Sequence, residues 1–295
     1  MNSSSKVPSI VLNDGTKIPQ LGFGVYQIER NETYKYVSKA LDVGYPHIDT
    51  AQSYANEKEV GQAVRDHKND VFVTTKYFNP NSSEHGYEDA KAYFSESFET
   101  LGLDHIDLYL IHFPVVKNDV YVEAWKAFVE LQKKEKLRSI GVSNFTRKYL
   151  KKIIEETGVT PSINQVECHP YLQQNELRKF HQEKGIVTEA WSPLGRGDVL
   201  NDEVLKQIGK KYNKTTAQVV LRWHIQIGNV TFPKSVTPER IEENFDIFDF
   251  SLSDEDMESI KKLDKNERNG PDPAEFQFPD DFMEKRRKER NSTNS

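Results

Sequence analysis

The sequence predicts an α/β fold, a closed barrel of eight parallel strands that alternate with helices. Three observations lead to this class. Short β-rich runs recur along the chain, amphipathic segments with helical spacing lie between them, and no linker rich in Pro, Gly and Ser divides the 295 residues. This alternation favours a (β/α)8 TIM barrel over two doubly wound halves. Since such barrels often span about 250 residues as one unit, we expect residues 1–295 to form a single domain.

The first predicted element is an N-terminal β-hairpin. Apolar residues flank Asn13-Asp14-Gly15, and Asp-Gly is a favoured tight turn. Eight β-rich runs then follow: LGFG (21–24), HID (47–49), VFVTTK (71–76), IDLYLIHF (106–113), RSIGVS (138–143), SINQVE (162–167), IVTEAW (186–191) and NVTF (229–232).

Helical spacing of apolar residues marks the segments between these runs. The predicted helices span 33–44, 59–67, 87–102, 122–137 and 216–228. The first of them ends in Gly44, which suits the residue just beyond a helix C-terminus. Strand and helix thus alternate in the order that a parallel barrel requires.

The pattern breaks after residue 265. The stretch NERNGPDPAEFQFPDDF contains three prolines and follows neither a strand nor a helix period. It is long for a structureless segment, which indicates a functional loop over the barrel rim; a tail packed along the barrel is the other interpretation. The basic and polar end, residues 281–295, is expected to be a tail.

Composition excludes several classes of function. The net charge of −6 argues against a nucleic-acid surface, which needs a positive field to neutralise phosphates. Cys168 is the single cysteine, so no disulfide can form within the chain. The N-terminus lacks the apolar segment of a secretory signal, and no run reaches the roughly 18 apolar residues of a membrane span. We expect a monomeric cytoplasmic protein without a membrane partner.

Four reactive side chains follow or end strands of the predicted barrel: Asp49, Tyr54, Lys76 and His112. In such barrels the chemistry lies at the C-terminal ends of the strands. Reduction of a carbonyl requires a proton at oxygen, and tyrosine is a poor acid near neutrality. An adjacent Lys76 ammonium would lower the pKa of Tyr54, Asp49 would hold the ammonium, and His112 would orient the substrate oxygen.

Each residue taken alone has a simpler interpretation. Asp49 could cap a helix, Tyr54 could pack, Lys76 could lie on the surface, and His112 could be a core histidine. The convergence of all four on one rim favours the reductase chemistry.

These segments resemble the aldo-keto reductase superfamily from about residue 10 to 280. GYPHIDTAQSYANEKEVG is similar to the family segment with the catalytic Asp and Tyr, TTKYFNP to that with the Lys, and SFETLGLDHIDLYLIHFP to that with the His. The resemblance implies carbonyl reduction by hydride transfer, with Tyr54 as general acid. A second hypothesis is a cofactor-binding regulatory subunit with little turnover, since the superfamily includes channel-associated subunits.

The usual dinucleotide fingerprint is missing, because GFGVYQ has Gln27 where a glycine is required. A barrel can instead hold phosphates after its last strands, at a helix N-terminus. PKSVTPERIEEN (233–244) places Lys234, Ser235 and Arg240 near such a start, although an ordinary charged cap is equally compatible. The resemblance implies an adenosine 2′-phosphate site at these three residues, adenine contacts at Glu243 and Asn244, and therefore NADPH.

The resemblance also implies where the rest of the cofactor lies. Ser143, Asn144 and Gln165 match the positions that hydrogen-bond the nicotinamide amide, and Trp191 matches the ring that stacks on it. The loop with Ser192 and Leu194 corresponds to the segment that crosses the pyrophosphate. No metal is expected, because Cys168-His169 has no partner motif with metal-ligand spacing.

An aromatic substrate mouth is predicted from a small set of residues, which consists of Tyr26, Gln52, Phe78, His112 and Phe113, with Tyr77 nearby. Such a mouth accepts small aldehydes, α-dicarbonyls or keto-sugar acids without selecting one. GPDPAEF (270–276) resembles the short C-terminal segment of the bacterial 2,5-diketo-gluconate and glyoxal reductase branch.

Overall fold

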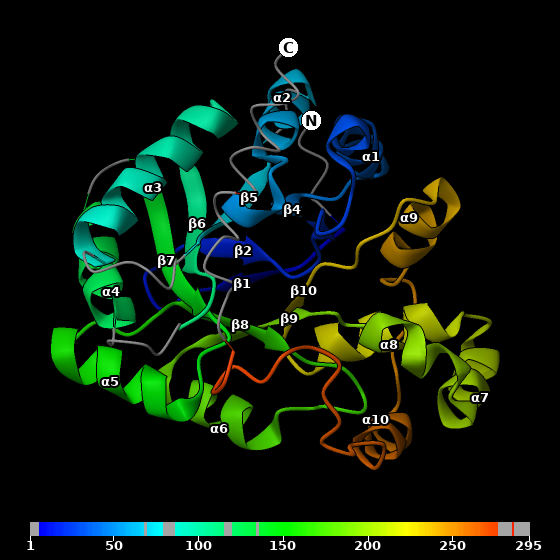
Figure 1. Ribbon diagram of the computed structural model, residues 1–295. Helices are drawn as coiled ribbons and strands as arrows, with labels where there is room; N and C mark the ends of the chain where they lie inside the picture. Colours follow the sequence, from blue (N-terminus) through cyan, green and yellow to red (C-terminus); the bar gives the residue numbers. More distant parts are fainter. Residues whose placement is uncertain are drawn as a thin grey trace.

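The computed structural model describes residues 6–67, 70–78, 86–114, 120–133, 136–276 and 285, and it has the predicted barrel (Figure 1). Within these residues the eight-stranded parallel sheet runs in chain order. Its strands are β3 (Phe23–Gly24), β4 (His47–Asp49), β5 (Phe72–Tyr77), β6 (Ile106–Ile111), β7 (Leu137–Ser143), β8 (Ile163–Glu167), β9 (Val187–Trp191) and β10 (Val230–Thr231).

Backbone hydrogen bonds join the first strand to the last and close the barrel. A parallel bridge pairs Leu21 with Thr231, and Gly22 N–H donates to the Thr231 carbonyl at 2.8 Å. A glycine is needed at position 24, where a Cβ would lie 2.9 Å from the Phe232 carbonyl oxygen. Gly24 therefore permits the close strand approach at the seam.

Helices surround the barrel, and the structure extends the helical prediction. These helices are α1 (Arg30–Val43), α2 (Glu57–His67), α3 (Gly86–Leu101), α4 (Val120–Leu131), α5 (Arg147–Thr157), α6 (Asn175–Lys184), α7 (Glu203–Tyr212), α8 (Thr216–Gln226), α9 (Pro238–Phe245) and α10 (Asp254–Lys261). The helix predicted over 122–137 is too long, because Leu137 is the first residue of β7. Helices α5, α6, α7 and α10 were not predicted from the sequence.

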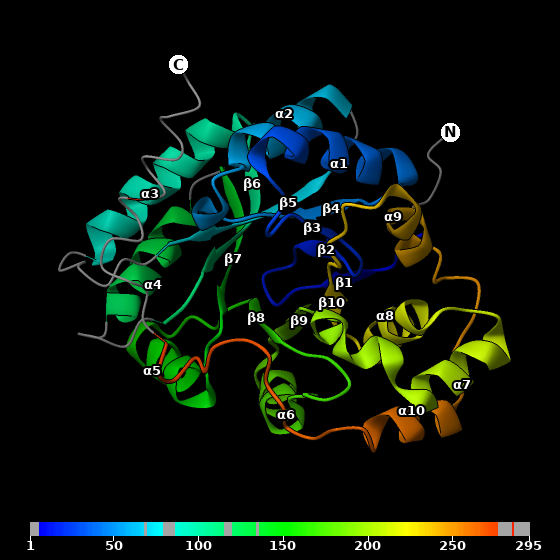
Figure 2. The ribbon, with the colours of Figure 1, turned by 45° about the vertical axis from the view of Figure 1, so that its right-hand side comes forward.

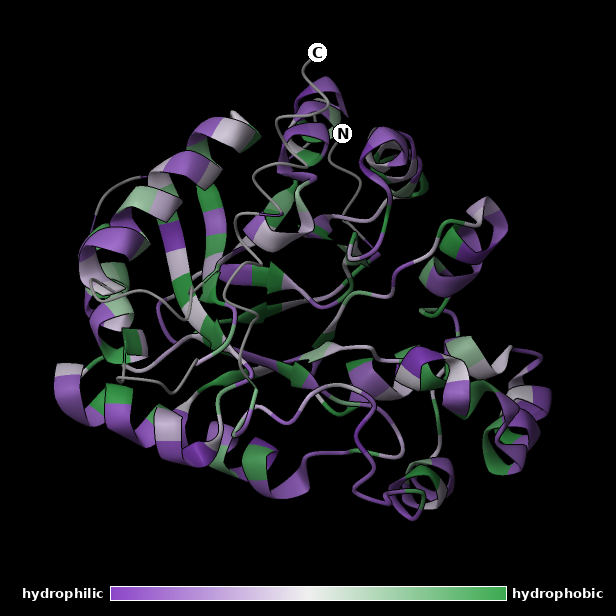
Figure 3. Cartoon of the chain, in the orientation of Figure 1, coloured by the Kyte–Doolittle hydropathy of each residue, from purple (hydrophilic) through white to green (hydrophobic). Residues whose placement is uncertain are grey.

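A large apolar core lies between the strands and the helices. The buried faces of α1 to α5 supply much of it, and green segments alternate with purple along these helices in Figure 3. Trp125 and Phe128 of α4 are fully buried, and the Phe128 ring stacks 4.7 Å from Tyr109 of β6. Burial of such aromatic side chains fixes each helix against its strands.

The predicted hairpin closes one end of the barrel. It consists of β1 (Ser9–Val11) and β2 (Lys17–Pro19), with Ile10 opposite Ile18 and Gly15 at a φ of +87° in the turn. Ile18 is fully buried in a cluster with Leu108 and Ile163 of the barrel interior. Apolar side chains thus fill the N-terminal end of the barrel, and reactive groups are left for the opposite end.

The chain returns to the barrel after α10. Figure 2 shows the segment after α10, in orange and red, running past α6 toward β8. This agrees with the predicted loop over the rim, whereas the predicted tail (281–295) lies outside the described residues except for Lys285. No described helix has the length and apolar character needed to cross a membrane.

Candidate active site

Asp49 and Lys76 form a buried ion pair at the centre of the site. Asp49 ends β4, and its register with Thr74 places it beside Lys76 of β5. The Lys76 ammonium lies 2.6 Å from Asp49 Oδ1 and donates to the Thr50 carbonyl at 2.8 Å. Both residues are at least 99 % buried, since Asp49 is 1 % and Lys76 0 % exposed. Each charge therefore depends on the other for compensation.

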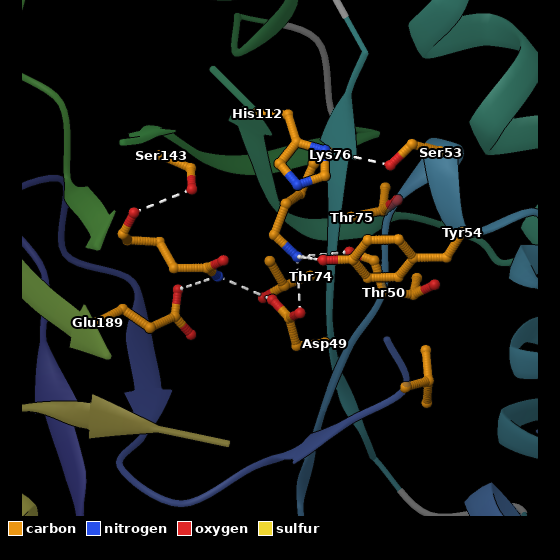
Figure 4. A network of polar contacts seen from close by, with 12 residues as sticks. Asp49, Thr50, Ser53, Tyr54, Thr74, Thr75, Lys76, His112, Ser143 and Glu189 are labelled. Carbon is orange, nitrogen blue, oxygen red and sulfur yellow. Dashed lines mark hydrogen bonds and ion pairs between the residues drawn. The ribbon is translucent and has the colours of Figure 1, made fainter. Parts of the chain in front are cut away.

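Tyr54 lies next to this pair, on the short 3-10 helix η1 (Gln52–Tyr54) that follows β4. Its hydroxyl oxygen is 3.5 Å from Lys76 Nζ (Figure 4). The pKa of Tyr54 is raised overall in this structure, against the expectation of a lowered value. Burial raises the pKa well above its ordinary value, and the charge of Asp49 adds to the rise. Since the ammonium is closer to Asp49 than to the phenol, Tyr54 keeps its proton and can donate it.

His112 follows β6 and lies beside the Tyr54 ring, with the two ring centroids 5.7 Å apart. Burial, together with the Lys76 charge, lowers the pKa of His112 well below its ordinary value, so the imidazole is neutral near pH 7. Its Nδ1 is 3.3 Å from the Ser53 hydroxyl. If Ser53 donates this hydrogen bond, the proton of the ring is on Nε2, where it can be donated to a substrate oxygen.

Hydrogen bonds connect the expected nicotinamide residues to one another and to His112. The Asn144 amide donates to the His112 carbonyl at 3.0 Å, and its Oδ1 accepts from Trp191 Nε1 at 2.9 Å. Ser143 donates to the Gln165 carbonyl at 2.9 Å. Asn144 has a φ of +63°, a conformation that asparagine tolerates better than most residues. The structure therefore brings these four residues together at the ends of β7, β8 and β9.

Ser192 and Leu194 follow Trp191 in a tight turn. Ser192 has a φ of +47°, and its carbonyl accepts from Gly195 N–H at 2.9 Å. Both side chains are half-buried. The turn leads into the 3-10 segment η3 (Gly195–Asn201), which places it directly beyond the end of β9.

A second group of expected cofactor residues lies at the start of α9. Lys234 and Arg240 are exposed, and in the described part of the chain neither forms an ion pair. The Ser235 hydroxyl accepts from Thr237 N–H at 3.1 Å, which fixes the turn before Pro238. Two uncompensated cations at a helix N-terminus suit a phosphate, and this donor set fits the 2′-phosphate of NADPH.

The expected adenine residues lie one turn further along α9. Glu243 is half-buried, and its Oε1 accepts from the Thr215 hydroxyl at 2.9 Å. Asn244 is 5 % exposed. Glu243 therefore contacts the start of α8, and both residues follow Arg240 by three and four positions, within one helical turn of that cation.

Two of the five expected substrate residues, Tyr26 and Phe113, lie beside the reactive side chains. The Tyr26 ring is 5.0 Å from the Tyr54 ring, and the Phe113 ring is 5.5 Å from the His112 ring. The Gln52 amide donates to Glu96 of α3 at 3.3 Å, and Phe78 is 1 % exposed. The Tyr77 ring packs against helices α3 and α4, where it contacts Tyr93 and Phe128.

The segment after α10 is fastened to the rim by Glu167, at the end of β8. The Glu167 carboxylate accepts from Asn269 N–H at 2.7 Å and from Gly270 N–H at 3.0 Å. Burial raises the pKa of Glu167, but these hydrogen bonds and His169 outweigh it, so the pKa is lowered overall. Gly270 lies so near Trp191 that a Cβ at this position would clash with the indole ring, and the Phe276 ring lies tilted against Phe113 with the two centroids 4.5 Å apart. The described part of this segment is therefore a packed wall beside the site.

Three residues of the site escaped the sequence analysis: Ser53 beside His112, Glu167 under the C-terminal segment, and Glu189 in the barrel interior. Glu189 is fully buried, and its Oε2 accepts from Gln165 Nε2 at 2.9 Å. Its position in IVTEAW was the one available signal, because a charged residue inside a strand flanked by apolar residues needs a partner.

Comparison with known proteins identifies the family. The model of the aldo/keto reductase family matches residues 20–265 of the chain. The chain belongs to this family. An aldo-keto reductase of Mycolicibacterium smegmatis is 50 % identical over 274 residues, which cover 92 % of this chain and 98 % of the relative.

Two further relatives carry more specific names. Methylglyoxal reductase DkgA of Escherichia coli is 46 % identical over 275 residues, which cover 91 % of this chain and 98 % of the relative. Among solved structures, a mutant of Gox0644 in complex with NADPH matches with a TM-score of 0.88 and 44 % identity, over 92 % of this chain and 99 % of that one. The predicted family and barrel are thus confirmed.

Proposed function

We propose that the chain reduces aldehydes and ketones to alcohols with NADPH, and that Tyr54 protonates the carbonyl oxygen. The chain is an NADP-dependent oxidoreductase by its family and relatives. The observation that carries the residue assignment is the contact of Lys76 with both Asp49 and Tyr54, at 2.6 and 3.5 Å. This arrangement joins a phenolic proton donor to a buried cation that can stabilise the phenolate.

Each member of the group has one task in this proposal. Tyr54 donates its proton to the substrate oxygen, and Lys76 stabilises the phenolate that remains. Asp49 holds the ammonium in place through the 2.6 Å contact. Neutral His112 donates a hydrogen bond from Nε2 to the same oxygen and so orients the carbonyl. A low-polarity surround strengthens all these interactions, because both ions are excluded from water.

The cofactor contacts follow from the two groups of residues at the rim. When bound, NADPH supplies the hydride for the carbonyl carbon. Ser143, Asn144 and Gln165 would hold the nicotinamide amide, and the Trp191 ring would stack on the nicotinamide. The pyrophosphate would lie along Ser192 and Leu194. At α9, Lys234, Ser235 and Arg240 would bind the 2′-phosphate, and Glu243 and Asn244 would contact adenine.

We propose α-dicarbonyls as the favoured substrates, with keto-sugar acids and small aldehydes as the wider class. A relative named methylglyoxal reductase supports this choice. The rings of Tyr26 and Phe113 beside Tyr54 and His112 give the site an apolar wall, which suits a small and weakly polar carbonyl compound.

The setting of the enzyme is also a proposal. We propose one domain that works as a monomer in the cytoplasm, without nucleic-acid or membrane partners. The net charge of −6 supports the absence of nucleic acid. Among the described residues, the large exposed apolar side chains are spread over separate elements, and such scattered exposure needs no partner to cover it. They are Val11, Tyr26, Tyr34, Val204 and Val236.

Purified protein tests the proposed reaction directly. With NADPH and a panel of aldehydes, ketones and α-dicarbonyls, we expect loss of the near-ultraviolet absorbance of NADPH and the highest kcat/KM for methylglyoxal. Tight NADPH binding without turnover on any member of the panel would contradict the proposal and favour a regulatory role.

A further inference from the structure

Glu189 is a second acidic residue in the buried network that the proposed reaction does not use. It lies on β9 and is fully buried. The amide nitrogen of Gln165 joins it to the ion pair, because this nitrogen donates to Glu189 Oε2 at 2.9 Å and to Asp49 Oδ2 at 2.8 Å. Figure 4 shows Glu189 and Asp49 on either side of this link, with Lys76 beyond Asp49.

The charges of this network do not balance if both acids are ionised. Lys76 is the cation in contact with Asp49, at 2.6 Å, and no ion pair between the described residues joins Lys76 to Glu189. Glu189 Oε1 is buried and has no hydrogen-bond partner among the described residues. A buried carboxylate with an unpartnered oxygen is strongly unfavourable. The geometry therefore assigns the negative charge to Asp49 and a proton to Glu189.

The groups that face Glu189 from neighbouring elements support this assignment. From β4, His47 Nε2 lies 3.9 Å from Glu189 Oε1, but burial lowers the pKa of His47 to about 3, so it is neutral. From β10, the residue in register is the apolar Val230. Among the described residues, the other titratable groups that interact with Glu189 are Asp49 on β4, Lys76 on β5 and Tyr54 on η1. Burial and the charge of Asp49 raise the pKa of Glu189 to about 8, against the opposing effects of Gln165 and Lys76.

We propose that Glu189 is a positioning residue that carries a proton at neutral pH, and that its ionisation in mild alkali makes Tyr54 a weaker acid. This rests on the proposed role of Tyr54. The protonated carboxyl accepts from Gln165 without competing with Asp49 for Lys76. Once ionised, Glu189 adds a second negative charge near the phenol, and such a charge raises the pKa of Tyr54 further.

The same proton links Glu189 to stability. A carboxyl whose pKa is raised on folding favours the folded state most below its ordinary pKa, roughly 4.3. That contribution declines as the pH rises and is lost above the folded pKa of about 8. The Glu189→Gln variant lacks this decline, so its Tm should exceed that of the wild type at pH 8 by more than at pH 5.

Infrared spectroscopy of the protein without substrate tests the protonation. We expect the carbonyl stretch of a protonated carboxyl at pH 7, its loss as the pH passes about 8, and its absence from Glu189→Gln. Glu57→Gln is the control, since Glu57 is a buried acid that accepts from Thr75 at 2.6 Å, and it should keep the band. A band that persists in Glu189→Gln, or that is missing from the wild type at pH 7, overturns the proposal.

Kinetics test the coupling to Tyr54. In alcohol oxidation, where Tyr54 must accept a proton, the rising limb of the pH profile should move to lower pH in Glu189→Gln, by about half a unit. Glu189→Leu removes the acceptor of Gln165, so kcat should fall by about tenfold with little change in KM, and Glu189→Gln should restore it. Identical profiles in wild type and Glu189→Gln contradict the coupling. Full activity of Tyr54→Phe would refute the proposed acid while leaving the infrared band in place, so the two failures are distinguishable.

Discussion

Charged residues inside the barrel are buried and paired, whereas those at the start of α9 are exposed and unpaired in the described part of the chain. Inside the barrel, Lys76 is fully buried and lies 2.6 Å from Asp49. At α9, Lys234 and Arg240 are exposed and without an ion pair in the described part of the chain. Inside the barrel the positive charge is neutralised by a protein carboxylate. At α9 the two positive charges have no protein partner in the described part of the chain and are available to an anionic ligand.

This difference separates the chemistry from the recognition of the cofactor. Buried groups held by short hydrogen bonds need no rearrangement when charge develops on a substrate oxygen. Exposed cations cost little to maintain in water and gain a strong partner when a phosphate binds. Substitutions inside the barrel should therefore affect stability and turnover together, and substitutions at α9 should affect nucleotide affinity alone.

The largest effect is expected from Lys76→Met. It leaves the Asp49 carboxylate buried without its cation, so the free energy of unfolding should fall by about 3–5 kcal/mol, and activity should be lost. Urea denaturation and an NADPH assay measure the two effects. In the double variant with Asp49→Asn most of the stability should return without the activity. If Lys76→Met alone were as stable as the wild type, the buried charges would not depend on each other for compensation.

Arg240→Ala tests whether the exposed cations at the start of α9 bind the 2′-phosphate. Because the side chain is exposed, stability should not change, whereas the Kd for NADPH should rise by about 30-fold, roughly 2 kcal/mol. The Kd for NADH should stay the same, since NADH lacks the 2′-phosphate. Fluorescence titration with both nucleotides measures this, with Lys262→Ala as an exposed control of equal charge. If the affinities for NADPH and NADH fell equally, Arg240 would not be a 2′-phosphate contact.

Glu167→Gln is expected to have an intermediate effect, because Glu167 is buried but its hydrogen bonds hold the C-terminal segment. Loss of its charged hydrogen bonds to Asn269 and Gly270 should lower the free energy of unfolding by about 1–2 kcal/mol at pH 7. A lowered carboxyl pKa stabilises the fold above its ordinary value and loses that effect as the pH falls through the folded value. The difference from wild type should therefore shrink below about pH 4. Exposed Glu258→Gln is the control, and faster amide exchange at Asn269 and Gly270 is the local readout.

Ser53→Ala should have the smallest effect. It removes the 3.3 Å contact to His112 Nδ1 that favours the Nε2–H tautomer, so kcat should fall by about threefold to tenfold with KM little changed. Steady-state kinetics with methylglyoxal measure it, and exposed Ser95→Ala is the matched control. An unaltered kcat would show that Ser53 does not set the tautomer.

The sequence predicted the barrel and the four reactive residues because strand periodicity and strand ends are local features. Asp49, Lys76 and His112 each follow or end a β-rich run, so their shared rim follows from the topology. The helix predicted over 122–137 was too long, since Leu137 fits the apolar pattern of a helix and of a strand equally well.

Side-chain contacts between strands could not be predicted from these local patterns. The bridge of Gln165 to Glu189 joins side chains of neighbouring strands whose spacing in the sequence carries no motif. The direction of the Tyr54 pKa depended on burial, which the order of residues does not reveal. The same holds for the hydrogen bond from the Gln52 amide to Glu96 of α3.

The most direct measurement is the turnover of Tyr54→Phe with NADPH and methylglyoxal. Phenylalanine keeps the ring and removes the proton, so kcat should fall by at least about 100-fold while the Kd for NADPH and the urea midpoint stay close to those of the wild type. Turnover equal to the wild type would show that Tyr54 is not the proton donor and would contradict the account of the site.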